Sequence, residues 1–169
     1  MRVENILFQL DITWQLFLYH IQNLSDDEAL WCKKAEGLQI HQVDGNWQID
    51  WPETEEYDLG PASIAWTMWH IIYWWEMVLN YSFGDCSLGK EDIEWPGSVK
   101  QAIDKIDSLH NQWIKSLSNL TLEQLQSKQY TKWPFSNRSF YDLALWINIE
   151  LMKNVSEIGY GRYLYAVSK

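Results

Sequence analysis

Residues 61–84, PASIAWTMWHIIYWWEMVLNYSFG, form the most apolar stretch of the chain and decide its fold. Apolar side chains fall on nearly every side of the helix that this stretch would form. We therefore predict a central helix that is buried on most sides. Pro61 directly follows Gly60 and lies near the expected start of the helix, where the missing N–H of proline costs no hydrogen bond.

Two other segments, at residues 4–23 and 98–117, repeat their apolar residues in steps of three and four, which is the period of an amphipathic helix. A last long helix is expected to begin near Ser139. We expect Gly159 and Gly161 to weaken the final third of the last helix. Four long helices without an internal repeat predict an all-α fold, an antiparallel four-helix bundle that packs up and down about one core. A length of 169 residues predicts a single domain over residues 1–169.

The connections between these helices also carry local signals. Ser25 and Glu28 have the spacing of a capping box, which predicts a short turn of helix over 25–31. Asp44-Gly45 lies between two alternating runs within 38–51, which predicts a small β-hairpin in the first long connection. A further short helix is expected within 119–129.

Charge and composition exclude several classes of function. The net charge is −10 and the Lys and Arg residues form no cluster, so we expect no binding to nucleic acid or to anionic membranes. Polar residues, His70 and Glu76 among them, interrupt the apolar stretch, which is too short to span a bilayer. Asp11 within the first apolar segment argues against a signal peptide. Cytoplasmic location is expected, with Cys32 and Cys86 as free thiols.

His70 lies in the middle of the apolar stretch and is either a core residue with a satisfied hydrogen bond or a ligand. Glu150 and Asn154 are four residues apart and share one face of the last helix, which Glu157 continues. If that face points inward, the carboxylate needs a partner, and a metal ion, a protonated His70 or Lys153 could supply it. The E-x-x-x-N spacing is also common on solvated helix faces, so that alternative stays open.

Two segments of the chain, SIAWTMWHIIYWW (63–75) and WINIELMKNVSEIGYGRYLYA (146–166), resemble the DinB/YfiT-like superfamily. The segments WQIDWP, WPGS and WPF resemble a Trp-rich branch of it. The resemblance implies a four-helix bundle that is often a homodimer. It also implies a divalent metal held by three histidines, one on the second helix and an H-x-x-x-H pair on the last. Characterised relatives include thiol-dependent transferases and isomerases.

Carried over by position, the second-helix histidine falls on His70 and the H-x-x-x-H pair falls on Glu150 and Asn154. The implied ligand set for Zn, Ni or Mn is thus one histidine, one carboxylate and one amide. A carboxylate is a sound ligand for these ions, whereas a neutral amide oxygen is a weak one. Without a metal, Glu150 is expected to pair with His70.

Two functions follow from this resemblance. The favoured one is a DinB-like protein with a variant or decayed metal site, which acts as a structural or ligand-binding bundle, because both last-helix histidines are missing. The alternative is a metal-dependent enzyme of the thiol-dependent transferase or hydrolase type. A homodimer is expected, as is a small-molecule ligand in a pocket with aromatic walls. The walls are expected from Trp66, Trp69, Trp74 and Trp146.

No catalytic residue is assigned from the sequence. The other histidines, His20, His41 and His110, are interpreted as surface or helix-face residues without a role.

Overall fold

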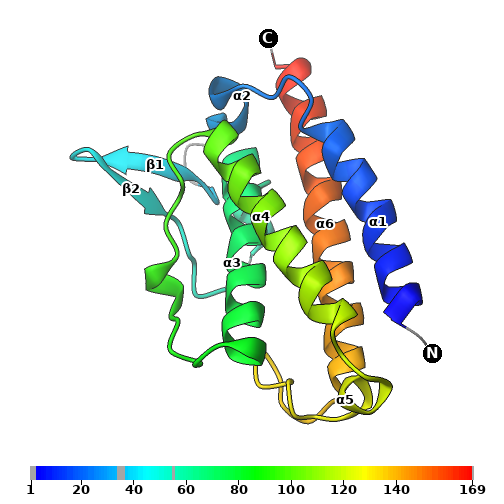
Figure 1. The fold of residues 1–169 in the computed structure, drawn as a ribbon. Helices are drawn as coiled ribbons and strands as arrows, with labels where there is room; N and C mark the ends of the chain where they lie inside the picture. Colours follow the sequence, from blue (N-terminus) through cyan, green and yellow to red (C-terminus); the bar gives the residue numbers. More distant parts are fainter. Residues whose placement is uncertain (1–2, 34–36, 55, 169) are drawn as a thin grey trace.

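The computed structural model describes residues 3–33, 37–54 and 56–168, and Figure 1 shows its fold. The four long helices are α1 (Val3–His20), α3 (Ile64–Phe83), α4 (Val99–Ser118) and α6 (Phe140–Ala166). The connections contain the short helices α2 (Asp26–Leu30) and α5 (Leu122–Gln126), the antiparallel strands β1 (Ile40–Val43) and β2 (Asn46–Ile49), and 3-10 turns at Tyr57–Leu59 and Lys90–Asp92. The predicted helical bundle with a hairpin after the first helices is confirmed.

Serine side chains set the start of several helices. Ser25, Ser63, Ser98 and Ser139 each accept a hydrogen bond from the backbone N–H three residues later. Such a cap satisfies one of the N–H groups that a helix leaves unpaired at its start. Because Ser63 is the cap of α3, the helix begins at Ile64, and Pro61 lies before it rather than in its first turn.

Helices α1 and α6 lie side by side and run in the same direction (Figure 1). At one end, Asn148 Nδ2 donates to the carbonyl of Ile6 at 3.0 Å. At the other end, Arg162 Nη1 donates to the carbonyl of His20 at 2.7 Å. The two helices are therefore parallel.

Helix α3 runs antiparallel to α6 but parallel to α4. The start of α3 packs against Gly161, and its last residue, Phe83, packs against Phe140 with ring centroids 5.5 Å apart. A simple up-down order would reverse the chain between α3 and α4. Residues 84–98 instead run back along the bundle, so that α4 starts at the same end as α3 (Figure 1). This long crossover is a known variant of bundle connectivity.

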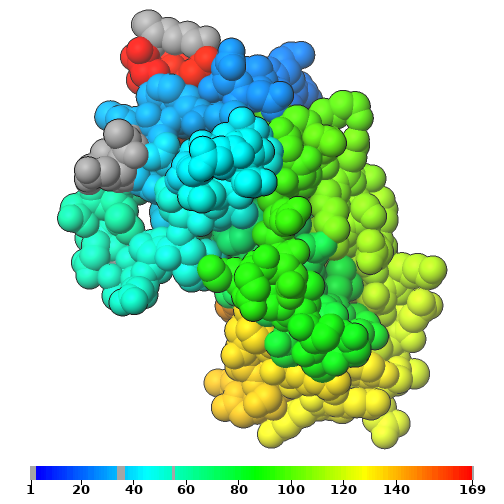
Figure 2. All heavy atoms as spheres, turned by 90° about the vertical axis from the view of Figure 1, so that its left-hand side faces the viewer, coloured from blue at the N-terminus to red at the C-terminus, as the bar shows by residue number. Residues whose placement is uncertain are grey.

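The crossover and the hairpin both cover α3. Trp69 Nε1 donates to the carbonyl of Ile93 at 2.8 Å, and Trp66 Nε1 donates to the carbonyl of Asp50 at 2.7 Å. Figure 2 looks onto this side, where the hairpin in cyan and the crossover in green lie next to each other. These contacts bury the face of α3 that points away from the bundle core, which explains its apolar residues on most sides.

The glycines of α6 do not end the helix, which continues to Ala166. Whether they weaken its final third stays a prediction. A Cβ atom on Gly159 would lie 2.5 Å from His20 Cε1, and one on Gly161 would lie 2.8 Å from Ile64 Cγ1. Both glycines therefore let neighbouring helices approach closely. This packing offsets a propensity cost of about 1 kcal/mol for each glycine.

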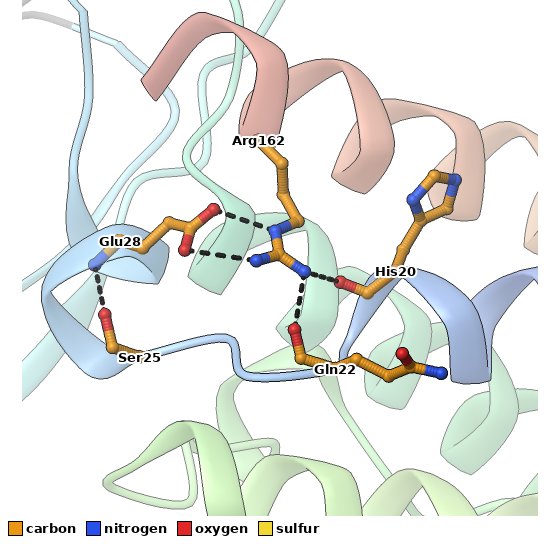
Figure 3. A network of polar contacts seen from close by, with 5 residues as sticks. All are labelled: His20, Gln22, Ser25, Glu28 and Arg162. Atoms are coloured by element: carbon orange, nitrogen blue, oxygen red, sulfur yellow. Dashed lines mark hydrogen bonds and ion pairs between the residues drawn. The ribbon is translucent and has the colours of Figure 1, made fainter. Parts of the chain in front are cut away.

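Arg162 joins α6 to the corner between α1 and α2 (Figure 3). Its Nε donates to Glu28 Oε1 at 2.8 Å, and its Nη1 donates to the carbonyls of His20 and Gln22 at 2.7 and 2.8 Å. The arginine thus satisfies the carbonyl of the last residue of α1 and one carbonyl just beyond the helix. Glu28 forms this ion pair in addition to the backbone bond from its own N–H to the Ser25 side chain.

The interpretation of His110 as a surface residue is wrong. His110 is 7% exposed and stacks on Trp14 of α1, with ring centroids 3.7 Å apart and planes 8° apart. Cys32 and Cys86 are free thiols, as expected. Among the described helices, none has the length and apolar character needed to cross a membrane.

Candidate functional site between helices α3 and α6

His70 lies on α3, is 4% exposed, and faces α6. Its Nδ1 lies 3.1 Å from Asn154 Oδ1, so the two residues paired by the sequence argument do meet. Its Nε2 accepts a hydrogen bond from Trp74 Nε1, 3.0 Å away and one turn along the same helix. Both ring nitrogens therefore have partners within the bundle.

The partners of His70 determine which nitrogen of the neutral ring carries the proton. An indole N–H can only donate, so Nε2 must be the acceptor in its bond with Trp74. The proton of the neutral imidazole is then on Nδ1, which donates it to the carbonyl oxygen of the Asn154 side chain. A proton on Nε2 would place two N–H groups against each other and break the bond with Trp74.

Glu150 lies one turn before Asn154 on α6 and pairs with Lys153. The Lys153 Nζ is 3.0 Å from Glu150 Oε2, and the Glu150 side chain is 19% exposed. No hydrogen-bond donor of the described chain is aligned with that buried oxygen. A metal ion, a protonated His70 and Lys153 were the three partners predicted for Glu150, and Lys153 is the one whose charge lies beside its carboxylate. Glu150 therefore does not lie on a solvated helix face.

The next polar residues of α6 have other roles. Asn148 is buried, but it faces α1, where its Nδ2 also donates to Gln9 Oε1 at 3.1 Å. Glu157 is exposed and lines a large cavity beside His70. The expected continuation of one inward polar face thus ends at Asn154.

These residues do not fit a divalent metal site. Metal binding by His70 needs a free lone pair, and in the neutral ring the single lone pair accepts the Trp74 N–H. Asn154 offers a weak neutral ligand that already accepts the Nδ1–H of His70. Within the described ranges, no cluster of three or more His, Cys, Asp and Glu side chains is arranged to hold a metal. The ligand set implied by the resemblance remains a prediction.

A cavity of about 720 Å³ opens next to His70. His70 and Trp66 line it from α3, and their rings stack with centroids 4.7 Å apart. Lys153, Glu157 and Tyr160 line it from α6. The cavity therefore combines an aromatic surface with charges of both signs.

The predicted aromatic walls are only partly found at this cavity. Trp66 lines it, whereas Trp69, Trp74 and Trp146 are not among its lining residues. Trp74 instead packs edge-on against Trp146 at 4.8 Å. The sequence reasoning missed the hydrogen bond from Trp74 to His70. The spacing of four residues, which puts both side chains on one helix face, was the signal that could have revealed it.

The comparisons with known proteins identify the family of the chain. No curated protein and no solved structure matches the chain. The sequence pattern of the DinB superfamily matches residues 9–158, which span α3, α4 and α1 from Gln9 onward, together with α6 up to Ile158. The chain therefore belongs to the DinB superfamily.

Proposed function

We propose that this chain is a metal-independent, ligand-binding member of the DinB superfamily, in which the expected metal position serves as a structural hydrogen-bond chain. The observation that carries this proposal is the 3.0 Å bond from Trp74 Nε1 to His70 Nε2. An indole N–H has no lone pair to offer a metal, and it occupies the one that His70 could offer.

The other two candidate ligands support the same interpretation. Asn154 is a neutral amide whose oxygen already accepts a hydrogen bond. Glu150 has Lys153 as its cation, and a lysine ammonium competes with a metal for the same carboxylate oxygen. The resemblance assigns histidines to both positions, so two strong ligands are replaced by one weak ligand and one engaged carboxylate.

The cavity beside His70 supports a binding role. Its volume of about 720 Å³ lies within the range of small-molecule sites. The stacked rings of Trp66 and His70 suit an aromatic or apolar body, and Lys153 with Glu157 suits polar groups at its edge. We therefore expect a small ligand with an apolar body and at least one polar group.

Thermal unfolding with Zn²⁺, Ni²⁺ and Mn²⁺ tests the metal-independent part of the proposal. A ligand that binds only the folded state stabilises it by about 2.7 kcal/mol at a hundred times its dissociation constant. For a domain of this size, that corresponds to a rise in melting temperature of about 5–10 °C. We expect no dose-dependent rise for the wild-type chain, and a clear rise would contradict the proposal.

Two variants provide the positive control. The E150H/N154H variant restores the H-x-x-x-H pair, and adding W74F frees the lone pair of His70. We expect the triple variant to show a metal-dependent rise in melting temperature, and the double variant to show a smaller one. Equal metal binding by both variants would mean that Trp74 does not control access to His70.

The second candidate function is a metal-dependent enzyme of the thiol-dependent type. The observation in its favour is Glu150 Oε2, a buried carboxylate oxygen for which no donor of the described residues is aligned. This alternative predicts a metal-dependent rise in the melting temperature of the wild-type chain, and loss of that rise in His70→Ala. The same titration therefore decides between the two candidates.

A further inference from the structure

Two buried polar atoms on the facing helices α3 and α6 lack hydrogen-bond partners within the described chain. Trp75 on α3 is 1% exposed, and its Nε1 donates to no acceptor of the described residues. Glu150 on α6 has a buried oxygen, Oε2, with which no donor of those residues is aligned. Buried polar groups are nearly always paired, either within the protein or with ordered water. These two atoms therefore need a partner that is not a protein atom.

Trp75, Glu150 and Asn154 line the same small cavity between α3 and α6. The rest of its walls come from Ile71, Trp74, Ile147 and Leu151. The centre of a water-sized molecule has about 10 Å³ of space in this cavity. One water molecule needs about that much, whereas sites for small organic ligands measure roughly 300 Å³ or more. The size of the small cavity therefore admits a single water and excludes a substrate.

The polar groups of the small cavity suit a water molecule. The indole N–H of Trp75 can only donate, and an ionised carboxylate such as that of Glu150 can only accept, whereas water does both. Asn154 contributes a third polar side chain, whose oxygen accepts from His70 and whose N–H groups can donate. Buried waters typically make about three hydrogen bonds. Three polar side chains are thus within the number that holds a buried water.

A metal ion does not suit the small cavity in the same way. The missing partner of Trp75 must accept a hydrogen bond, and a cation has no lone pair with which to do so. The charge of Glu150 is already matched by the ammonium of Lys153, 3.0 Å from Oε2. His70 is not among the residues that line the small cavity. This cavity therefore differs from the metal position that the resemblance implies.

We infer that the small cavity is a binding site for one water molecule, which accepts from Trp75 Nε1 and donates to Glu150 Oε2. Two neighbouring tryptophans of α3 are then linked to two polar residues of α6, Trp74 through His70 to Asn154 and Trp75 through the water to Glu150. The water also supplies the buried carboxylate oxygen with an aligned donor. This inference goes beyond the proposed function and does not depend on a ligand in the large cavity.

NOE and ROE spectra between water and the ¹⁵N-labelled chain in EDTA test the water site. We expect the indole proton of Trp75 to show a cross-peak to water with opposite signs in the two spectra, which marks a bound water rather than proton exchange. Glu150→Leu should lose this cross-peak, because the substitution removes the acceptor and fills the cavity. Glu157→Leu is the matched control and should keep it, since Glu157 does not line the small cavity. Absence of the cross-peak in the wild-type chain, or its survival in Glu150→Leu, would overturn the inference.

A crystal structure of the wild-type chain grown in EDTA supplies a second test that needs no variant. We expect electron density for one water at about 2.7–3.2 Å from both Trp75 Nε1 and Glu150 Oε2. A dry cavity, or a water that reaches only one of the two atoms, would contradict the inference. The metal titration of the wild-type chain is a separate measurement. A metal-dependent rise in melting temperature would defeat the proposed function and leave the water site, observed without metal, in place.

Discussion

His70 and His110 are both buried in the middle of long helices and both touch tryptophan rings, yet they are held in different ways. His70 joins α3 to α6 through hydrogen bonds at both ring nitrogens. His110 joins α4 to α1 by stacking on Trp14. The imidazole of His110 forms no hydrogen bond with another residue of the described chain, although its backbone takes part in the hydrogen bonds of α4.

The two rings also differ in what surrounds their nitrogens. Burial lowers the pKa of His110 below its ordinary value, although the nearby charges of Asp107 and Asp11 act in the opposite direction. Stacking provides no acceptor for an added proton, so the neutral ring is favoured. His70 is instead fixed in one orientation and one tautomer by Asn154 and Trp74. A buried histidine among aromatic rings is therefore not by itself evidence of a ligand, because its hydrogen-bond partners decide its role.

The largest effect is expected for His70→Ala. This change leaves a cavity and removes the partners of the Asn154 oxygen and the Trp74 N–H, both within the bundle. We expect a loss of about 3–5 kcal/mol in the free energy of unfolding, measured with urea. His110→Ala removes the stacking on Trp14 but leaves no hydrogen-bonding group without its partner, so we expect a smaller loss in the free energy of unfolding. A loss below about 1 kcal/mol for His70→Ala would show that its hydrogen bonds do not stabilise the fold.

A smaller effect is expected for Trp74→Phe. The ring volume is largely kept, but Nε2 of His70 loses its donor, so we expect a loss of about 1–2 kcal/mol in urea unfolding. Trp146→Phe is the packing control, because Trp146 contacts Trp74 edge-on and its replacement leaves the partners of His70 in place. Equal losses in the free energy of unfolding for Trp74→Phe and Trp146→Phe would mean that the hydrogen bond from Trp74 to His70 does not contribute measurably to stability.

The smallest effect is expected for the pH dependence of stability. Because the folded-state pKa of His110 is lowered, the unfolded chain binds a proton first as the pH falls below the ordinary value of 6.5. The free energy of unfolding should therefore decrease as the pH is lowered through this range. His110→Phe should keep the stacked ring and make the decrease shallower.

Part of this pH dependence should remain in His110→Phe. Burial, and to a lesser degree the charge of Arg162, also lowers the pKa of His20. Urea unfolding of both proteins at several pH values measures the difference. Identical slopes for the wild type and His110→Phe would mean that His110 titrates alike in the folded and unfolded states.

Local features of the fold could be predicted from the sequence. Serine caps and the Asp-Gly turn of the hairpin depend on residues within a few positions of each other. The order of the helices could not be predicted, because periodicity identifies the buried face of a helix but not its neighbour. The parallel packing of α3 and α4 depends on the path of residues 84–98.

The candidate site was predictable in part. The resemblance placed His70 opposite Asn154, and the structure brings them to 3.1 Å. The large ring of Trp74 predicts a wall of the aromatic pocket. In the structure, the indole N–H of Trp74 instead donates to His70 and determines which ring nitrogen of that histidine carries the proton. His110 continues the apolar stripe of α4, four residues after Ile106, and the neighbouring polar residues obscured that pattern.

Long-range ¹H–¹⁵N NMR of the His70 ring tests the central claim most directly, because it distinguishes a protonated ring nitrogen from one with a lone pair. We predict a neutral ring with the proton on Nδ1 and a hydrogen-bonded lone pair on Nε2, unchanged when Zn²⁺ is added. A proton on Nε2, or ring signals that move with added Zn²⁺, would contradict the account.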